Sequence, residues 1–381
     1  MGKIYTAMGL MSGTSLDGVD VSIIKSDGNK EISLIFDRYF EYNKELTQKI
    51  LNIRQKIINT EKLNKHLDEI NNLERDITLF HIKAVKEVLE QSKYVVDLIG
   101  FHGQTIFHDP EKKITKQLGD GKLLSQLTKK KVVYNFRQND LENGGQGAPL
   151  TPIFHNVLAN KINSKFDLGY PLNILNIGGI SNITSTVSWE NLGQVNKIFA
   201  FDIGPGNCLI DEWIRKNSKK KYDKDGLIAS SGIIDKLILN QALENFTENS
   251  NYKKSLDVRD FDISFAKGLS LENGAATISS FTAKLIANGM SYSHDKYNPG
   301  KCKWLVCGGG RKNKYLLDSI KNNFEKINIE SIDQYEIDGD FVESQAFAYL
   351  AIRSLLKLPI SFPNTTGCKE PTIGGVIVKN F

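Results

Sequence analysis

The sequence predicts an α/β protein in which one plan of strands and glycine-bearing loops occurs twice. Over 381 residues, short apolar and β-branched runs alternate with amphipathic helical patterns. Several of the predicted strands end in glycine-bearing loops, and after residue 168 the order begins again. Each half is therefore expected to form a mixed sheet with helices on its faces.

The first half is expected to begin with three strands and two helices, because apolar residues first alternate and then recur every three or four positions. A fourth strand leads into His102-Gly103-Gln104-Thr105, and after a polar loop a fifth strand precedes a helix opened by Pro149 and Pro152. The expected strands span residues 4–9, 19–24, 32–40, 94–101 and 131–136. The expected helices span residues 46–57, 63–80 and 149–158.

The second half repeats this order, with a strand closed by Gly178-Gly179, two further strands, a long helical region and a strand closed by Gly308-Gly309-Gly310. The expected strands span residues 172–177, 182–187, 197–201, 304–307 and 327–332. Helical patterns span residues 209 to about 290, 313–324 and 343–356. The repetition lies in the pattern of elements and not in the residue types, and a chance recurrence within an α/β chain is the alternative.

Composition and charge are those of an ordinary globular protein. Hydrophobic residues make up 40% of the chain and charged residues 24%, which excludes intrinsic disorder of the whole chain. The formal net charge is +5, which is small for this length. The basic runs Lys129–Lys131 and Lys219–Lys221 have no interleaved aromatic residues, so we expect a small-molecule ligand and no nucleic-acid partner.

Cysteine content and hydropathy predict a cytoplasmic protein. The four cysteines form no zinc-binding pattern, and so few thiols indicate a reducing compartment. The N-terminal segment 1–9 reaches glycine too soon for a signal peptide. Residues 168–189 carry no charge, but their asparagines and adjacent glycines are costly in lipid, so we expect no membrane span.

The loop Met11–Gly18 between the first two strands is the first candidate site. Glycine allows backbone N–H groups to approach an anion closely, and the Ser and Thr hydroxyls add donors. Asp17 or Asp20 can hold a hydrated Mg²⁺ against the same phosphates. A plain hairpin turn is the alternative interpretation.

The glycine-bearing segments 176–182 and 308–310 also follow predicted strands. They remove side chains from patches of backbone on which adenine or ribose can lie, or against which a helix can pack closely. The sequence contains no Walker A loop, no dinucleotide-binding glycine motif after the first strand and no nucleophile elbow. The absence of the glycine motif after the first strand disfavours a dinucleotide-binding fold.

Two charged residues are candidates for chemistry. Asp202 ends a predicted strand just before the loop Gly204–Asn207, where a carboxylate can act as a general base, or it caps the helix that begins near Leu209. Arg137 can bind a carboxylate or phosphate with two parallel hydrogen bonds, or form an ordinary surface salt bridge.

For three further polar residues and one acid, the neighbouring sequence favours a structural role over a functional one. His102, Gln104 and His108 follow the fourth strand without a metal-ligand spacing, so hydrogen-bonded loop residues are the favoured interpretation. Glu343 opens the last long helix, where an acid is stabilised by the helix dipole.

Taken in order, these segments resemble the anhydro-N-acetylmuramic acid kinase family. The segments that carry the resemblance are Gly9–Asp20, Phe101–Thr105, Asn135–Arg137, Gly144–Leu150, Asn176–Thr184, Phe201–Asn207, Gly308–Gly310 with Asn313, and Glu343 with Ala346–Ala348. One such match is weak, whereas eight in order over nearly the whole chain are specific. The lysine- and asparagine-rich segments 216–224 and 245–262 match no motif, and the tail 363–368 resembles the family's end without an assigned role.

The resemblance implies a fold of the acetate and sugar kinase, heat-shock and actin type. In such a fold two ribonuclease-H-like domains, each a mixed five-stranded sheet flanked by helices, face a central nucleotide cleft. The first actin-like ATPase domain is expected at residues 1–168 with about 357–381 returning to it, and the second at residues 169–356.

The resemblance also implies a phosphotransferase with an alcohol group as acceptor. ATP, 1,6-anhydro-N-acetylmuramic acid and water would give N-acetylmuramic acid 6-phosphate and ADP, in peptidoglycan recycling and amino-sugar catabolism. The alternatives are another sugar or carboxylate kinase of the same superfamily, or a non-catalytic actin-like nucleotide switch. A homodimer is a further expectation.

Individual roles follow from matching residues in these motifs. The resemblance implies that Asp202 is the general base and that Asp17 and Asp20 hold Mg²⁺ through water. The residues implied for ATP and its metal are Gly13, Thr14, Ser15, Leu16, Asp17, Gly18, Val19, Asp20, Gly178, Gly179, Gly204, Gly308, Gly309, Gly310 and Asn313. The residues implied for the sugar are Gln104, Arg137, Asn207 and Glu343.

Overall fold

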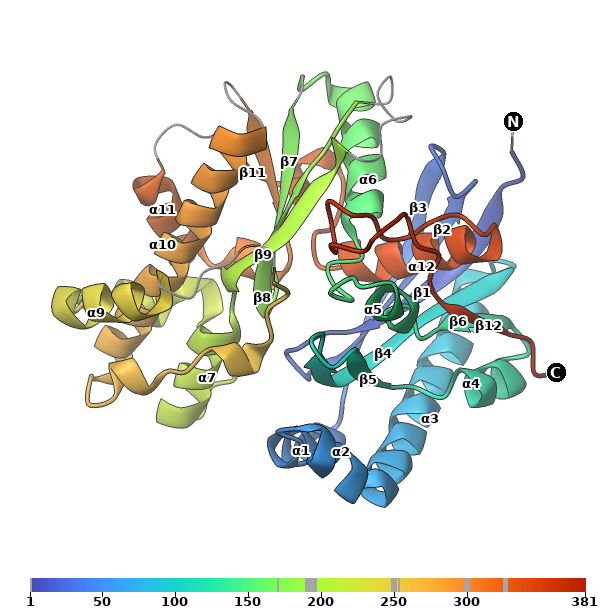
Figure 1. The fold of residues 1–381 in the computed structure, drawn as a ribbon, viewed down its shortest axis with the longest axis horizontal. Helices are drawn as coiled ribbons and strands as arrows, with labels where there is room; N and C mark the ends of the chain where they lie inside the picture. Colours follow the sequence, from blue (N-terminus) through green and yellow to red (C-terminus); the bar gives the residue numbers. More distant parts are fainter. Residues whose placement is uncertain are drawn as a thin grey trace. The chain divides into compact units, whose positions relative to one another are not determined.

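A computed structural model describes residues 2–169, 171–188, 197–247, 252, 254–297, 302–324 and 328–381. The chain divides into two compact units. Unit 1 comprises residues 1–161 and 341–381, and unit 2 comprises residues 162–340. Each unit is built on one sheet (Figure 1).

The sheet of unit 1 has seven strands. Its order is β12 (Val376–Val378), β6 (Lys131–Tyr134), β4 (Leu98–Asp109), β1 (Tyr5–Ser12), β2 (Gly18–Ser26) and β3 (Ile32–Glu41), with β5 (Ile114–Leu118) paired to β4. The first three strands form an antiparallel meander, whereas β4 runs parallel to β1 and β6 runs parallel to β4. The sheet is therefore mixed, as predicted.

The expected count of five strands is wrong for this unit. The expected five form its central part, but β5 adds a hairpin to β4 and β12 adds an antiparallel edge strand to β6. In addition, β4 begins four residues later than predicted and continues through His102 and Gln104 to Asp109. Polar residues after Phe101 resemble a loop in the sequence, but here they extend a paired strand.

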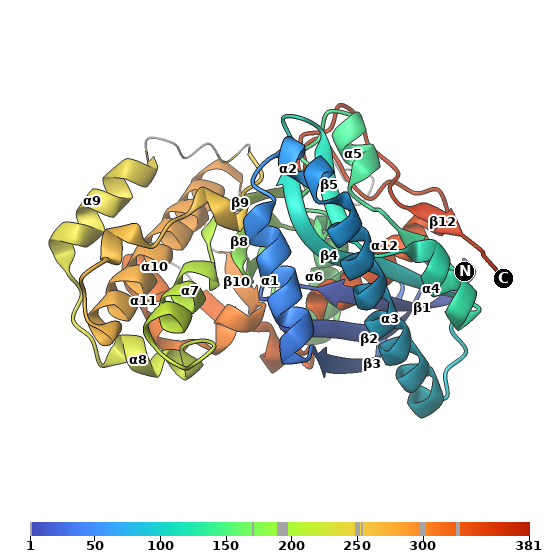
Figure 2. The same cartoon turned by 90° about the horizontal axis from the view of Figure 1, so that it is seen from below.

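Helices cover both faces of this sheet. The helices of this unit are α1 (Lys44–Lys56), α2 (Thr60–Lys65), α3 (Leu67–Ser92), α4 (Gly121–Thr128), α5 (Gln138–Glu142) and α12 (Val342–Leu355), together with the first part of α6 (Pro152–Phe166). On one face, Ile70, Leu73 and Ile77 of α3 pack in a core with Val19 and Val21 of β2. Figures 1 and 2 show α12 on the opposite face from α3.

Two glycines in neighbouring strands allow α12 to lie close to the sheet. Gly9 of β1 and Gly100 of β4 are paired in register. A Cβ atom on Gly9 would lie 1.8 Å from the Ser344 carbonyl oxygen, and one on Gly100 would lie 2.1 Å from the Phe347 carbonyl oxygen. Both are backbone atoms of α12, so no side-chain rotation relieves the overlap.

We therefore expect Gly100→Ala to destabilise unit 1 by about 1–3 kcal/mol or more, because the helix backbone must move away from a packed sheet. Urea unfolding followed by circular dichroism measures this. Gly2→Ala is the matched control, since a Cβ there meets its nearest neighbour, Asp27, at an ordinary 3.7 Å. Equal stability of Gly100→Ala and the parent chain would contradict the close approach.

The sheet of unit 2 repeats the central order of the first. It runs β11 (Asn328–Ser331), β10 (Lys303–Cys307), β7 (Leu172–Ile177), β8 (Ile180–Ser185) and β9 (Phe199–Pro205). Its first three strands in sequence form an antiparallel meander, and β10 and β11 follow parallel to β7. The predicted duplication is confirmed: both units have the strand order and orientations of a ribonuclease-H-like domain.

The helical part of unit 2 lies mainly between β9 and β10. It comprises α7 (Cys208–Asn217), α8 (Leu227–Ser230), α9 (Lys236–Thr247), α10 (Leu271–Tyr297) and short 3₁₀ turns at Lys224–Gly226, Val258–Asp260 and Ser264–Ala266. After β10 come a 3₁₀ turn at Gly309–Lys312, α11 (Lys314–Asn323) and, after β11, a 3₁₀ turn at Ile332–Tyr335. Ile203, Trp213, Ile278, Ile286 and Trp304 belong to one core that joins α7 and α10 to the sheet.

The boundaries between elements and units differ from expectation at several points. The unit boundary falls within α6, and α12, expected in the second domain, packs on β1, β2 and β4 of unit 1. The uncharged stretch 168–189 contains β7, a tight turn and β8, and its residues 170 and 189 lie outside the described part. The first residue of the predicted strand 327–332, Ile327, also lies outside the described part. Among the residues described, no helix has both the length and the apolar character needed to cross a membrane.

Candidate functional site

The sequence-predicted site residues fall into two groups, one in each unit. Unit 1 contains the β1–β2 loop, Gln104, Arg137 and Glu343. Unit 2 contains Asp202, Asn207, Asn313 and the remaining glycines.

The loop between β1 and β2 is tied down at both ends. At its start, the Gly13 carbonyl accepts hydrogen bonds from Gln104 Nε2 at 2.9 Å and from the Leu16 N–H at 3.3 Å. At its end, the Asp17 carbonyl accepts from the Tyr42 N–H at 2.7 Å and from the Tyr39 hydroxyl at 2.9 Å. Between these anchors Thr14 and Ser15 are exposed, whereas Leu16 is buried. The predicted hairpin is present, and Gly18, Val19 and Asp20 belong to β2.

A buried hydrogen-bonded chain lies beneath this loop. Ser12 Oγ is 2.9 Å from the Tyr42 hydroxyl and 3.0 Å from His81 Nε2, while His81 Nδ1 is 2.8 Å from the Ile77 carbonyl oxygen. A carbonyl only accepts, so Nδ1 carries the proton, Ser12 donates to Nε2 and Tyr42 donates to Ser12. Burial lowers the pKa of His81 to about 4, so the ring is neutral at pH 7.

This histidine makes the stability of unit 1 dependent on pH. Between about pH 6.5 and 4 the unfolded chain binds a proton that folded His81 does not, so stability is lost as the pH falls through this window. We expect His81→Gln to flatten the decline by up to about 1.4 kcal/mol per pH unit. Urea unfolding of both proteins at several pH values measures it, and parallel declines would contradict the burial of a neutral ring.

Asp17 and Asp20 lie in one electrostatic neighbourhood. Asp17 is exposed and accepts from Ser15 Oγ at 2.6 Å, and Asp20 is half-buried in β2. Burial is the main cause that raises the pKa of Tyr42, and the negative charges of both carboxylates raise it further. The pKa of Tyr39 is also raised, mainly by burial and in addition by the charges of the same two carboxylates. Among the described residues no group of three or more His, Cys, Asp or Glu side chains is arranged to hold a metal. A cation here would therefore take its remaining ligands from elsewhere.

Arg137 is held by a histidine and a glycine loop. Its Nε and Nη2 lie 3.1 and 2.9 Å from His102 Nε2, and its Nη1 donates to the Gly147 carbonyl at 2.7 Å. His102 Nδ1 is 2.8 Å from the Gly103 carbonyl oxygen, so Nδ1 carries the proton and Nε2 accepts. Burial, together with the charge of Arg137, lowers the pKa of His102 well below its ordinary value.

The Gly147 loop is itself fixed by a buried acid. Asp140 is 1% exposed, and its carboxylate accepts from the Gly147 N–H at 2.7 Å and from Thr366 Oγ1 at 2.6 Å. The C-terminal tail, to which the sequence assigned no role, thus supports the loop that holds Arg137. The ring centroids of His102 and of Phe347, which belongs to α12, lie 4.5 Å apart. The first turn of α12 carries Glu343, which is half-buried. His102 therefore joins Arg137 to the helix that carries Glu343.

Asp202 lies inside β9 and not at its end, because the strand continues through Gly204 to Pro205. The side chain is 6% exposed, and its Oδ2 accepts from the Leu256 N–H at 2.9 Å and from Ser255 Oγ at 3.2 Å. The alternative that Asp202 caps the following helix is wrong, since Asn207 is the N-cap residue of α7. Asp202 is therefore a buried carboxylate with two hydrogen-bond donors on one of its oxygens.

The turn after β9 packs on the turn between β7 and β8. The Gly206 N–H donates to the Gly179 carbonyl at 2.9 Å, and the Asn207 N–H donates to the Gly178 carbonyl at 2.8 Å. A Cβ on Gly206 would lie 2.2 Å from the Gly178 oxygen. The structure thus brings Gly178, Gly179 and Asn207 together.

The three consecutive glycines after β10 have different surroundings. Cβ atoms on Gly308 and Gly310 would lie 2.5 Å from Asn176 Oδ1 and 2.2 Å from Ile177 Cγ2, and Gly308 has a φ of 80°. A Cβ on Gly309 would meet only Asn207 Nδ2, at 3.8 Å. Two of the glycines therefore serve close packing, whereas Gly309 borders open space beside Asn207.

Arg311 fixes this turn. It is 7% exposed and donates to Asp333 at 2.8 Å, Asp338 at 3.1 Å, Asp340 at 2.5 Å and the Gly308 carbonyl at 3.2 Å. Burial lowers the pKa of Arg311, but its hydrogen bonds to Asp333 and Asp340 outweigh burial and raise it. Asn313 has a local structural role, because its Oδ1 accepts the Leu316 N–H at 3.0 Å and caps α11.

Sequence reasoning missed Ser255, Arg311, Asp140 and Thr366. Arg311 directly follows the glycines and its three aspartates lie within eight residues of one another, so charge pattern offered a signal. Ser255 lies in a segment that matched no motif, and only its contact with Asp202 reveals it.

Comparison with known proteins identifies the family to which this chain belongs. Residues 5–380 match the sequence family described as anhydro-N-acetylmuramic acid kinase. The chain is 53% identical to the anhydro-N-acetylmuramic acid kinase of Pelagibacter ubique (strain HTCC1062) and 38% identical to that of Agrobacterium fabrum (strain C58 / ATCC 33970), over the full length of each protein and of this chain. With the predicted motifs in place in both units, the chain belongs to the anhydro-N-acetylmuramic acid kinase family.

Proposed function

We propose that this chain hydrolyses the 1,6-anhydro bond of 1,6-anhydro-N-acetylmuramic acid and phosphorylates O6, consuming ATP and giving N-acetylmuramic acid 6-phosphate and ADP. The observation that carries the proposal is the match to the kinase family over residues 5–380. The named activity of relatives that are similar over their full length supports it. The reaction would serve peptidoglycan recycling and amino-sugar catabolism in the cytoplasm.

Asp202 is the proposed general base. A water molecule attacks C1, its oxygen bonds to C1, and its proton passes to the Asp202 carboxylate and later to solvent. The C1–O6 bond breaks, and O6 takes the γ-phosphoryl group of ATP as ADP leaves. Because phosphoryl transfer captures the leaving oxygen, no second carboxylic acid is needed to protonate it, unlike in most glycosidases.

The β1–β2 loop is proposed to bind the transferring phosphates. Its anchored ends and exposed Thr14 and Ser15 suit phosphoryl transfer, which depends mainly on positioning and on charge neutralisation. Arg137 is proposed to bind the sugar through guanidinium N–H groups, with Gln104 and Glu343 as further sugar contacts. In this role His102 and the Gly147 carbonyl orient the guanidinium.

Asp17 and Asp20 fit the way proteins hold Mg²⁺, which takes one or two carboxylates and completes its shell with phosphates and water. Their shared influence on Tyr39 and Tyr42 supports a position near one another. When bound, Mg²⁺ would neutralise charge on the phosphates of ATP.

In unit 2, Gly309 and Asn207 are proposed to contact the ligand, since Gly309 borders open space beside the Asn207 amide. The remaining glycines, Gly178, Gly179, Gly204, Gly308 and Gly310, are proposed to shape this surface for the nucleotide. Asn313 is proposed to act through the cap of α11 rather than through ligand contact.

The proposal is tested by incubating the protein with ATP, Mg²⁺ and 1,6-anhydro-N-acetylmuramic acid and following the products by phosphorus NMR and mass spectrometry. We expect a sugar 6-phosphate and ADP in equal amounts, with no sugar product when ATP is left out. Phosphorylation of ordinary sugars with a free hydroxyl, and none of the anhydrosugar, would indicate another sugar kinase instead. Light scattering of the same sample tests the proposed homodimer.

A further inference from the structure

We propose that Ser255 is a positioning residue for Asp202, and that together with the Leu256 N–H it holds the carboxylate in the orientation required for proton abstraction. The inference rests on the proposed role of Asp202 as general base. Ser255 Oγ lies 3.2 Å from Asp202 Oδ2, and the Leu256 nitrogen lies 2.9 Å from the same oxygen. The two residues are more than fifty positions from Asp202 in the sequence, so the contact is made by the fold.

An aspartate on a strand needs such support. The terminal torsion of Asp is broad, so packing alone leaves the plane of the carboxylate poorly defined. Two donors that converge on one oxygen fix this plane, and they stabilise the anion through charge-assisted hydrogen bonds. Proton abstraction depends on near-attack geometry, in which small displacements are costly. A fixed carboxylate is therefore worth more to the rate than to the binding of either substrate.

The donors are held firmly on their C-terminal side. Directly after Leu256, Asp257 caps a 3₁₀ turn at Val258–Asp260, and the Asp257 N–H donates to Asp260 Oδ2 at 2.7 Å in a capping box. Asp257 Oδ1 also accepts from Arg259 Nε at 2.7 Å. These local bonds define the backbone that presents the Leu256 N–H.

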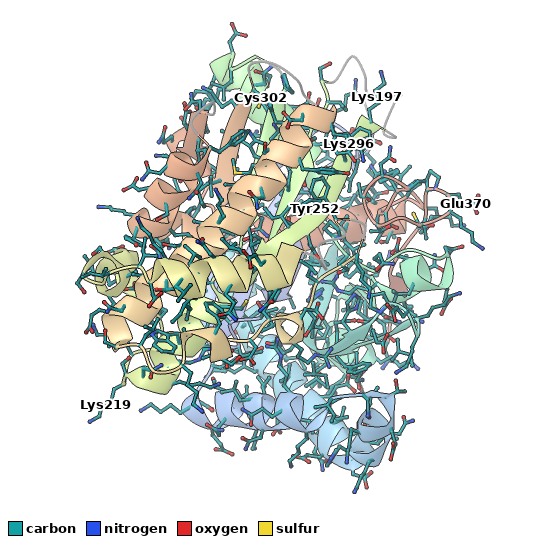
Figure 3. The ribbon with its side chains drawn as sticks, turned by 60° about the vertical axis from the view of Figure 1, so that its left-hand side comes forward. Lys197, Lys219, Tyr252, Lys296, Cys302 and Glu370 are labelled. Carbon is teal, nitrogen blue, oxygen red and sulfur yellow. The ribbon has the colours of Figure 1, made fainter. Side chains whose placement is uncertain are left out.

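On the N-terminal side an aromatic contact links the segment to Asp202's own strand. The Tyr252 ring stacks on Tyr292 of α10 with centroids 4.8 Å apart, and it lies 5.3 Å from the ring of Phe201. Figure 3 shows Tyr252 alongside α10, the helix that also carries Lys296. Because Phe201 immediately precedes Asp202, the contact between Tyr252 and Phe201 links the chain before Ser255 to the strand that carries the proposed general base.

Ser255→Ala tests the inference. We expect kcat to fall about tenfold to a hundredfold, the loss typical of one hydrogen bond to a charged group, while KM for ATP and for the anhydrosugar stays within about twofold. Ser255→Thr restores the hydroxyl and should recover kcat to within about threefold of the parent chain. Ser264→Ala, an exposed serine in the same region, is the matched control and should change neither parameter.

The outcomes separate this inference from the function on which it rests. If Asp202→Asn retains activity, the general-base role itself fails. If Asp202→Asn is inactive while Ser255→Ala keeps the parent kcat, only the positioning role fails. A rise in KM without a fall in kcat, or no recovery in Ser255→Thr, would also overturn the inference. Unfolding midpoints, followed by the fluorescence of buried Trp213 and Trp304, separate each result from a general loss of folding.

Discussion

Asp202→Asn is expected to lower kcat/KM for the anhydrosugar by about 10²–10⁴-fold, the usual contribution of a general base. The carboxamide is nearly isosteric and can still accept hydrogen bonds from Ser255 and Leu256, but it cannot take the proton of the attacking water. Ring opening and phosphorylation should be lost together, because both need the water to attack. Steady-state kinetics measure the loss, and calorimetric titration should show ATP affinity within about threefold of the parent chain.

Asp262→Asn is the matched control for this substitution. Asp262 is exposed and accepts the Ser264 N–H, which an asparagine also does. We expect the control to keep parent kinetics. An Asp202→Asn variant that phosphorylates the anhydrosugar at the parent rate would remove Asp202 from the mechanism.

Arg311→Met is expected to destabilise unit 2 by about 1.5–3 kcal/mol, the range for loss of hydrogen bonds to charged groups, because the aspartates left behind are partly exposed to water. The guanidinium side chain is 3% exposed and serves three aspartates as well as the Gly308 carbonyl. Without it, the three carboxylates repel one another and the glycine turn loses a support. Urea unfolding followed by fluorescence of Trp304, on β10, measures the change.

The neighbouring Lys312 provides the control for Arg311. Lys312 also pairs with Asp340, but its side chain is 57% exposed, so Lys312→Met should cost less than about 1 kcal/mol. In folded Arg311→Met protein at low temperature we further expect weaker ATP binding, because Gly308–Gly310 is no longer held. Equal stability losses in the two variants would contradict the special role of Arg311.

Periodicity predicted most of the fold because the main strands and helices have clear local patterns. The β1–β2 hairpin, α3 and α12 were found in this way, although His66 divides the second predicted helix into α2 and α3. The missed strands are those with weak patterns: β5 contains Thr115, Lys116 and Gln117, and β12 has only three residues. Both depend on pairing with strands that are already in place, which no local pattern records.

The candidate site divides in the same way. Glycine loops and the position of Asp202 near one of them are local features, and the sequence contained them. The sequence did not predict where β9 ends, because Gly204 and Pro205 are typical of a turn. In the structure these two residues continue a strand that is paired to β8. Nor did the sequence predict the pairs His102–Arg137 and Ser255–Asp202, whose members lie 35 and 53 residues apart. Contacts of this range follow from topology.

The most direct test of the central claim, that water attack and phosphoryl transfer are coupled, is the reaction in ¹⁸O-labelled water. The protein is incubated with ATP, Mg²⁺ and 1,6-anhydro-N-acetylmuramic acid, and the product is trapped before the anomeric oxygen exchanges. We predict N-acetylmuramic acid 6-phosphate with one ¹⁸O at C1 and none in the phosphate. Label in the phosphate, or a phosphorylated sugar that retains its anhydro bond, would contradict the account.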